Sequence, residues 1–179
     1  KISSSNLLIS TKLIKINDLI SFVRAIKNTP ELTLVDKIID KGFVIADLNI
    51  NFNENGKIKD DYELRGIIKD VNITLLNNNK IQDINFNFIH ENSKSIFQDI
   101  SFAYQDLKIV SNELNVNNDD KEIFLKGELE TKSITIDKKE TSNYLNFGND
   151  LGIEKIKFSS INDLEISLTK RFKIENYNI

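Results

Sequence analysis

The chain has 179 residues, of which 40% are hydrophobic and 28% charged, a composition typical of a folded globular protein that excludes a disordered one. Its formal net charge of −3 argues against a nucleic-acid-binding protein, because such a protein needs a basic surface for phosphates. The absence of Cys excludes a disulfide framework, a zinc site built on thiolates and a thiol nucleophile.

The start of the chain indicates a module of something longer. It begins at Lys1 without an initiator Met, so we expect a section of a larger protein. No window reaches the roughly 18 apolar residues of a membrane-spanning helix. Residues 1–10 are too polar for the apolar region of a signal peptide. Any anchor or export signal is therefore expected outside this chain.

The N-terminal quarter mixes two periodicities. Apolar and polar residues alternate within residues 1–16, which predicts a strand. In residues 17–28 the apolar side chains recur at helical spacing. We expect Pro30 to end that helix, because proline disfavours the helical conformation of the residue before it. A second, shorter helix is predicted over Glu31–Asp40, with Gly42 as its C-terminal stop.

From Gly42 onward the period changes to two, which is typical of strands with one apolar face. The apolar parity flips near Ile67–Asp70, and a flip within one extended run predicts a β-bulge or a short corner. Tyr62–Gly66 and Ile123–Gly127 share the pattern apolar-x-Leu-x-Gly, a weak internal repeat. A short helix is expected at Thr141–Leu151, followed by further strands.

The predicted fold is mainly β: a long antiparallel, strongly twisted sheet or an open half-barrel groove, with one or two N-terminal helices that plug or flank it. Three sections are expected. Residues 1–41 hold the first strand and the helices, residues 42–140 form the β-meander repeat section, and residues 141–179 hold the short helix and the start of a further β repeat.

No residue pattern points to an enzyme, a metal site or a cofactor. His90 is the only histidine, and a surface position beside a turn is the interpretation we favour over a catalytic one. The chain has no spaced Asp-x-Asp loop for calcium, and its glycines are too isolated to form a phosphate-binding nest. The paired carboxylates of glycoside chemistry are neither indicated nor excluded.

The apolar stripe along the strands is the one feature with functional content. It can form the sealed core of a sandwich or barrel, which would be a structural or interaction scaffold. Alternatively, the sheet curls into an open trough and leaves part of the stripe for acyl chains, since a large exposed apolar strip needs a partner.

The order of the sequence segments along the chain resembles that of a known family. The segment LVDKIIDKGFVIADLNINF (Leu34–Phe52), then YELRGIIKDVNI, IQDINFNFIHEN, DLKIVSNELNV and IFLKGELETKSITI resemble AsmA-like bacterial envelope proteins, in particular the YhdP and TamB branch. The resemblance covers about Glu31–Ile136, and the remainder more loosely. It rests on pattern and not on a catalytic motif.

This resemblance implies a periplasmic protein, anchored in the inner membrane through a segment absent from this chain. Its stacked β units would form a curved sheet that passes phospholipid or another acyl lipid to the outer membrane, with no cofactor and no nucleic acid. The resemblance does not identify the envelope proteins that the chain would contact. The implied lipid-facing residues are Val44, Leu48, Ile50, Phe52, Tyr62, Leu64, Ile84, Phe86, Phe88, Ile100, Phe102, Ile123, Leu125 and Leu129.

Overall fold

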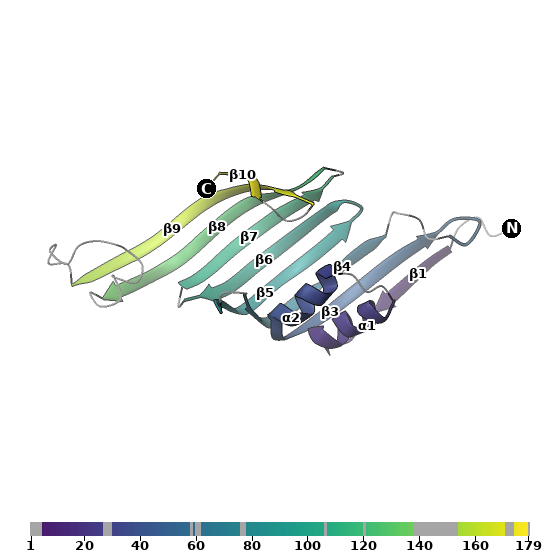
Figure 1. Ribbon diagram of the computed structural model, residues 1–179, viewed down its shortest axis with the longest axis horizontal. Coiled ribbons are helices and arrows are strands. Elements are labelled where there is room, and N and C mark those ends of the chain that lie inside the picture. Colours follow the sequence, from purple (N-terminus) through teal and green to yellow (C-terminus); the bar gives the residue numbers. More distant parts are fainter. Residues whose placement is uncertain are drawn as a thin grey trace.

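The computed structural model describes residues 5–26, 30–57, 59, 62–75, 78–105, 107–119, 121–137, 154–170 and 174–178. Two helices and ten strands make up the described part of the chain (Figure 1). In chain order they are β1 (Ser5–Ser10), β2 (Ile14–Lys15), α1 (Ile16–Ile26), α2 (Pro30–Ile38), β3 (Ile39–Phe52), β4 (Glu63–Thr74), β5 (Lys80–Glu91), β6 (Lys94–Tyr104), β7 (Leu107–Asn118), β8 (Glu122–Asp137), β9 (Lys155–Thr169) and β10 (Ile174–Asn178). The helix expected at Thr141–Leu151 lies outside the described residues.

All ten strands belong to one antiparallel sheet, which confirms the predicted fold class. From β3 to β10 each strand pairs with its successor, so the sheet is a meander. Strands β1 and β2 both pair with β3, along different stretches of it. The sheet does not close on itself: within the described strands, β1 and β2 form one edge and β10 forms the other.

The two helices follow β2 and precede β3 along the chain. Helix α1 matches the predicted helix, but Pro30 was expected to end it and instead begins α2, where the missing proline N–H would have had no partner anyway. Gly42 does not stop α2, which ends at Ile38; it lies inside β3. This position takes glycine for two reasons. Its φ is 150°, and a Cβ added to it would lie only 2.3 Å from Val71 Cγ2.

Helix α1 covers one end of the sheet. Val44, Ala46, Ile68 and Val71 form a buried cluster on β3 and β4, and Ile16 and Leu19 of the helix region pack against it. Asn17 Nδ2 donates to the Ile39 carbonyl over 3.3 Å, and an ion pair between Arg24 and Asp36 joins the two helices. The expectation that a helix flanks the sheet is confirmed.

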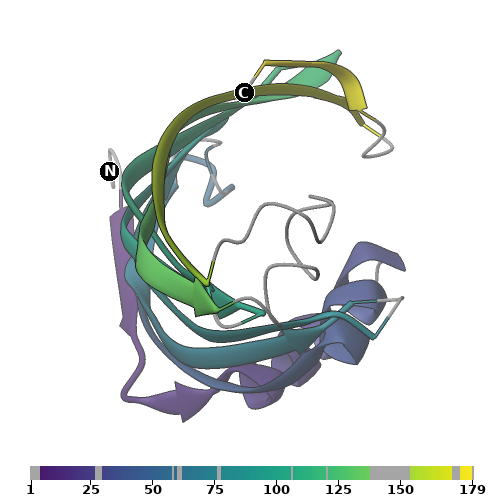
Figure 2. The same ribbon diagram turned by 90° about the vertical axis from the view of Figure 1, so that its left-hand side faces the viewer.

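Bulges in successive strands curl the sheet. Asp70, Asp83 and Asp99, on β4, β5 and β6, have φ values of 53°, 51° and 52°. The pairing of β4 with β5 shifts between Ile68 and Val71, which confirms the bulge predicted from the parity flip. Bulges bend the strand and increase its twist. Viewed end-on, the ribbon forms an open C with the helices at one lip (Figure 2).

Candidate functional site

The strand register gathers the alternating apolar residues on the inner side of the C, the concave face. We call a row of directly paired residues across neighbouring strands a rung. One rung crosses seven strands without a polar side chain: it runs through Ala46, Gly66, Phe88, Phe97, Leu114, Gly127 and Leu164. The two glycines of the predicted repeat thus occupy equivalent positions, four strands apart on this rung.

The fourteen residues predicted to face lipid fall on this one face. In the register, Val44, Leu48, Ile50 and Phe52 share a parity on β3, and Leu64 lies opposite Leu48. The remaining residues continue the same face on β5, β6 and β8: Ile84, Phe86, Phe88, Ile100, Phe102, Ile123, Leu125 and Leu129. Tyr62 lies just before β4 and reaches His90 of β5 on this side of the sheet.

The concave side chains differ in how far they are covered. Val44 is 2% exposed beneath α1 and Ile100 is 7% exposed, so these two pack the interior. The other twelve predicted residues are half-buried. A sheet sealed by a second layer would bury them as deeply as Val44; the described chain instead leaves them partly accessible.

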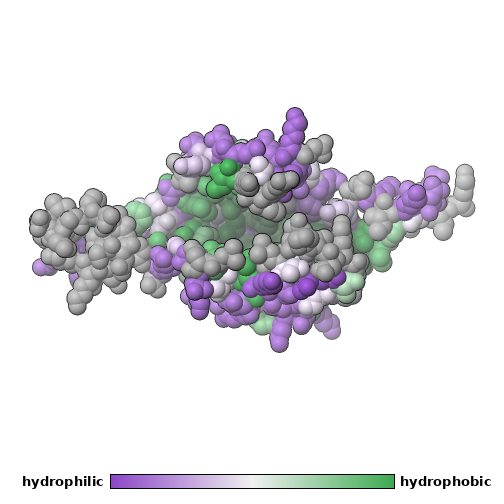
Figure 3. Space-filling view, viewed as in Figure 1, coloured by the Kyte–Doolittle hydropathy of each residue, from purple (hydrophilic) through white to green (hydrophobic). Residues whose placement is uncertain are grey.

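Charge is segregated to the opposite, convex face. In the described parts of β3 to β9, outside the bulges, the register puts no Asp, Glu, Lys or Arg on the concave face. The ion pairs of Asp47 with Arg65 and of Lys126 with Glu165 lie on the convex face. Figure 3 shows the resulting pattern, an apolar hollow between hydrophilic rims.

Hydrogen bonds order the convex face further. The side-chain amide of Gln98 donates to Glu113 over 3.0 Å and that of Asn115 over 2.7 Å; these two bonds lower the pKa of the Glu113 carboxyl. A hydrogen bond from Lys126 to Glu165 raises the pKa of that lysine. These groups remain charged in water and cannot serve the groove chemically, because they point away from it.

The centre of the concave face is a hollow of about 310 Å3. The side chains that line it are all apolar: Ile81, Ile84, Phe86, Phe97, Ile100, Phe102, Leu114 and Leu125. Phe86 meets Phe97 edge to face at 5.5 Å between ring centroids and Phe88 at 6.3 Å. Ligand pockets commonly measure roughly 300–1,000 Å3, so this hollow has the size of a small one and the chemistry for hydrocarbon.

A polar group interrupts the apolar surface on the next rung, between Leu64 and Val116. His90 of β5 lies directly opposite Ser95 of β6. Its Nδ1 is 2.8 Å from Ser95 Oγ, and its Nε2 is 3.1 Å from Tyr62 Oη. From the sequence we expected a surface residue beside a turn here. The structure instead gives His90 a half-buried position on the concave face, near the end of its strand.

This arrangement is not a hydrolase triad. In a triad the serine and a carboxylate occupy different ring nitrogens of the histidine. Here a serine and a tyrosine occupy them. Nor does any cluster of three or more His, Asp and Glu side chains among the described residues have the arrangement to hold a metal ion.

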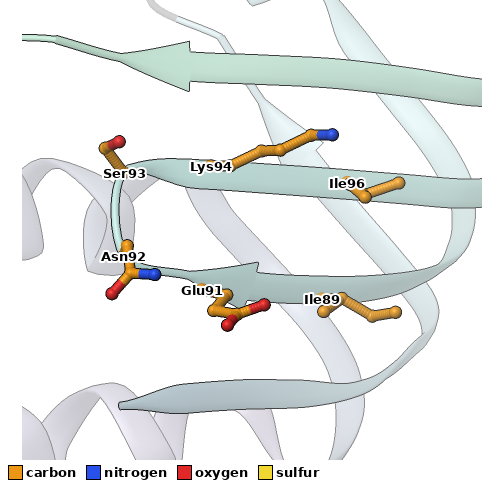
Figure 4. A pocket seen from close by; sticks show the side chains of 6 residues that line it. All are labelled: Ile89, Glu91, Asn92, Ser93, Lys94 and Ile96. Atoms are coloured by element: carbon orange, nitrogen blue, oxygen red, sulfur yellow. The ribbon is translucent and has the colours of Figure 1, made fainter. Parts of the chain in front are cut away.

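Two further hollows of mixed lining lie on the convex face among the residues that the structure describes. One, of about 320 Å3, lies at the β5–β6 hairpin among Ile89, Glu91, Asn92, Ser93, Lys94 and Ile96 (Figure 4). Figure 4 shows these side chains spread along two strands and their turn without converging on one point. The other, of about 370 Å3, lies around Arg65 and Ile67. Neither hollow gathers a recognisable set of chemical groups.

Comparison with known proteins identifies no relative: no family model, no curated protein and no solved structure matches the chain. No helix in the described part is long and apolar enough to span a bilayer. The candidate site therefore rests on the geometry of the concave face alone.

Proposed function

We propose that this chain binds the acyl chains of lipids along its concave face, as a section of a protein that moves lipid between membranes. The observation that carries the proposal is an uncharged, mainly apolar surface that continues across β3 to β9 and stays only half-buried over most of its length. Contiguous apolar surface beyond a few hundred Å2 is rare on soluble proteins unless it binds something.

The energetics favour loose binding along the face over one fixed position. Burying each methylene of a tail releases about 0.8 kcal/mol, so ten methylenes release roughly 8 kcal/mol. Association itself costs about 4–15 kcal/mol, which leaves little net affinity. Because most residues of successive rungs are apolar, many neighbouring positions differ little in energy. A tail can thus slide along the face while its headgroup stays in water at the rim.

The cellular setting is part of the same proposal. The sequence pattern resembles AsmA-like envelope proteins, and an open, curved antiparallel sheet with an apolar inner side suits that resemblance. We place the chain in the periplasm, as a section of an inner-membrane-anchored protein that passes phospholipid toward the outer membrane. Both described sheet edges leave backbone groups available for neighbouring β units. The process needs no covalent step and no cofactor.

A protein-interaction scaffold is the second candidate. Its support is the convex face, where Phe43, Ile45, Ile67 and Ile89 are each 37–38% exposed. This exposed apolar patch would suit a protein partner. A pure scaffold has no use for accessible concave residues, however, so the half-buried inner side chains favour lipid binding.

Native mass spectrometry of the chain purified under mild extraction tests the proposal. We expect adducts with the masses of phospholipids or fatty acids. Leu48→Glu should remove them, since the new carboxylate would lie on the concave face. Ile67→Glu is the matched control, because it places the same charge on the convex face of the neighbouring strand. Equal loading of both variants would refute the assignment of the lipid-binding face.

A further inference from the structure

The Tyr62–His90–Ser95 group is placed to meet the headgroup of a bound amphiphile. Its rung adjoins the rung of Phe88 and Phe97, two residues or roughly 7 Å along the strands. On its other side, Asn92 and Ser93 turn the chain from β5 into β6, so the group lies near the rim. An amphiphile with its tail in the apolar hollow can therefore place its polar end here.

Counting hydrogens shows what this group offers a ligand. With a neutral imidazole, the ring N–H and the two hydroxyls supply three polar hydrogens. The two internal hydrogen bonds use two of them, so one hydroxyl hydrogen remains for a ligand. With a charged imidazolium, both ring N–H groups donate to the hydroxyl oxygens. Both hydroxyl hydrogens are then released, and a positive charge lies behind them.

The charged side chains near His90 face the convex side, so none of them lies beside the imidazolium on the concave side. Glu63, Glu91 and Lys94 lie opposite one another on β4, β5 and β6, and all three face the convex side. On the concave face, the residues opposite this group on β4 and β7 are Leu64 and Val116. In the described part of this face, the only titratable neighbour of the imidazole is Tyr62. An anion would therefore meet two hydroxyl donors and an unbalanced cation in a partly apolar setting.

We propose that Tyr62, His90 and Ser95 bind the acidic headgroup, a carboxylate or a phosphate, of an amphiphile whose tail occupies the apolar hollow. The proposal rests on the lipid-binding function above and adds the headgroup class to it. Binding couples to protonation: an acidic headgroup stabilises the imidazolium, and the imidazolium strengthens binding in return. A neutral headgroup gains no such strengthening.

The test uses three probes with the same tail: dodecanoate, dodecyl phosphate and dodecanol. Their affinities are measured by calorimetry at pH 5.5 and at pH 8, because a lower pH favours the imidazolium over the neutral imidazole. We expect dodecanoate to gain about tenfold over dodecanol on acidification, the effect of roughly one charge-assisted hydrogen bond. His90→Gln, which keeps polar contacts but cannot become charged, should abolish that gain and retain dodecanol binding.

A second readout tests position. His90 is the only histidine of the chain, so its imidazole carbon-bound protons can be followed by NMR without assignment. The midpoint of its titration should move to higher pH with dodecanoate and stay in place with dodecanol. Tyr62→Phe should reduce the acid preference, and Ser93→Ala, in the exposed turn, should leave it unchanged.

The outcomes separate the two proposals. Acid-dependent preference for dodecanoate, dodecyl phosphate or both supports the headgroup site and identifies the acid that it accepts. Equal pH dependence of all three probes, or a preference that survives His90→Gln, overturns the headgroup site and leaves the groove standing. Failure of every probe to bind overturns the groove and the headgroup site together.

Discussion

Replacing Phe86 by Glu should abolish lipid binding while the sheet still folds. Phe86 is half-buried and lines the central hollow beside Phe88 and Phe97. A carboxylate there keeps its hydration water and displaces about four tail methylenes. Since burial of each methylene releases about 0.8 kcal/mol, the loss is roughly 3 kcal/mol of binding free energy, or about a hundredfold in affinity. The folding cost is smaller: truncating a fully buried Phe costs about 3–5 kcal/mol, and this ring is only partly buried.

Fluorescence displacement of a fatty-acid probe measures the loss, with circular dichroism to verify the sheet. Ile89→Glu is the control on the same strand. Its side chain is 37% exposed on the convex face, directly opposite Arg65, which can accommodate the new charge. We expect unchanged binding in this variant. If Phe86→Glu binds the probe as tightly as Ile89→Glu does, the concave hollow is not the lipid site.

Three further predictions concern stability, each measured by urea unfolding. Gly66→Ala should destabilise the sheet by about 1–3 kcal/mol, because a Cβ at this position would lie 2.3 Å from the carbonyl oxygen of Ile45; an unchanged midpoint would show that the strands can separate freely. Asn92→Val should cost about 1–2 kcal/mol, because Asn92 has φ of 54° in the β5–β6 turn and a β-branched residue tolerates that conformation poorly; equal stability would mean that the turn rearranges. The lowered pKa of Glu113, caused first by the Gln98 hydrogen bond, means that its charged form favours the fold. This stabilisation is present above the ordinary carboxyl value and is lost as the pH falls through the lowered one. Glu113→Gln should therefore flatten the acid side of the stability profile, and an identical profile would contradict this.

Much of the sheet was predictable because strand periodicity reports burial directly. Between its bulges the chain after Gly42 mostly alternates apolar and polar residues, so the parity that faces the inner side of the C could be assigned before the register was known. The bulge at Asp70 was predictable for the same reason, since Ile68 and Val71 must both face inward. The bulge at Asp83 was not predicted, although Ile81 and Ile84 are separated by two polar residues in the same way as Ile68 and Val71.

The helix ends and the polar group were harder to predict. Pro30 is compatible with either end of a helix, and only packing decides between them. Tyr62 and His90 are 28 residues apart, and their contact depends on the offset between β4 and β5. Sequence periodicity fixes which face a residue occupies but not which residue lies opposite it. The pairing of His90 with Ser95 across the short β5–β6 turn was the one part of this group that the sequence could have indicated.

The most direct test of the central claim is an NMR measurement with a fatty acid that carries a nitroxide spin label on its tail. We predict strong broadening of the side-chain signals of Ile84, Phe86 and Phe102, which lie around the hollow, and clearly weaker broadening for Ile67 and Ile89 on the other side of the same sheet. Broadening confined to Ile67 and Ile89, or spread equally over both faces, would contradict it.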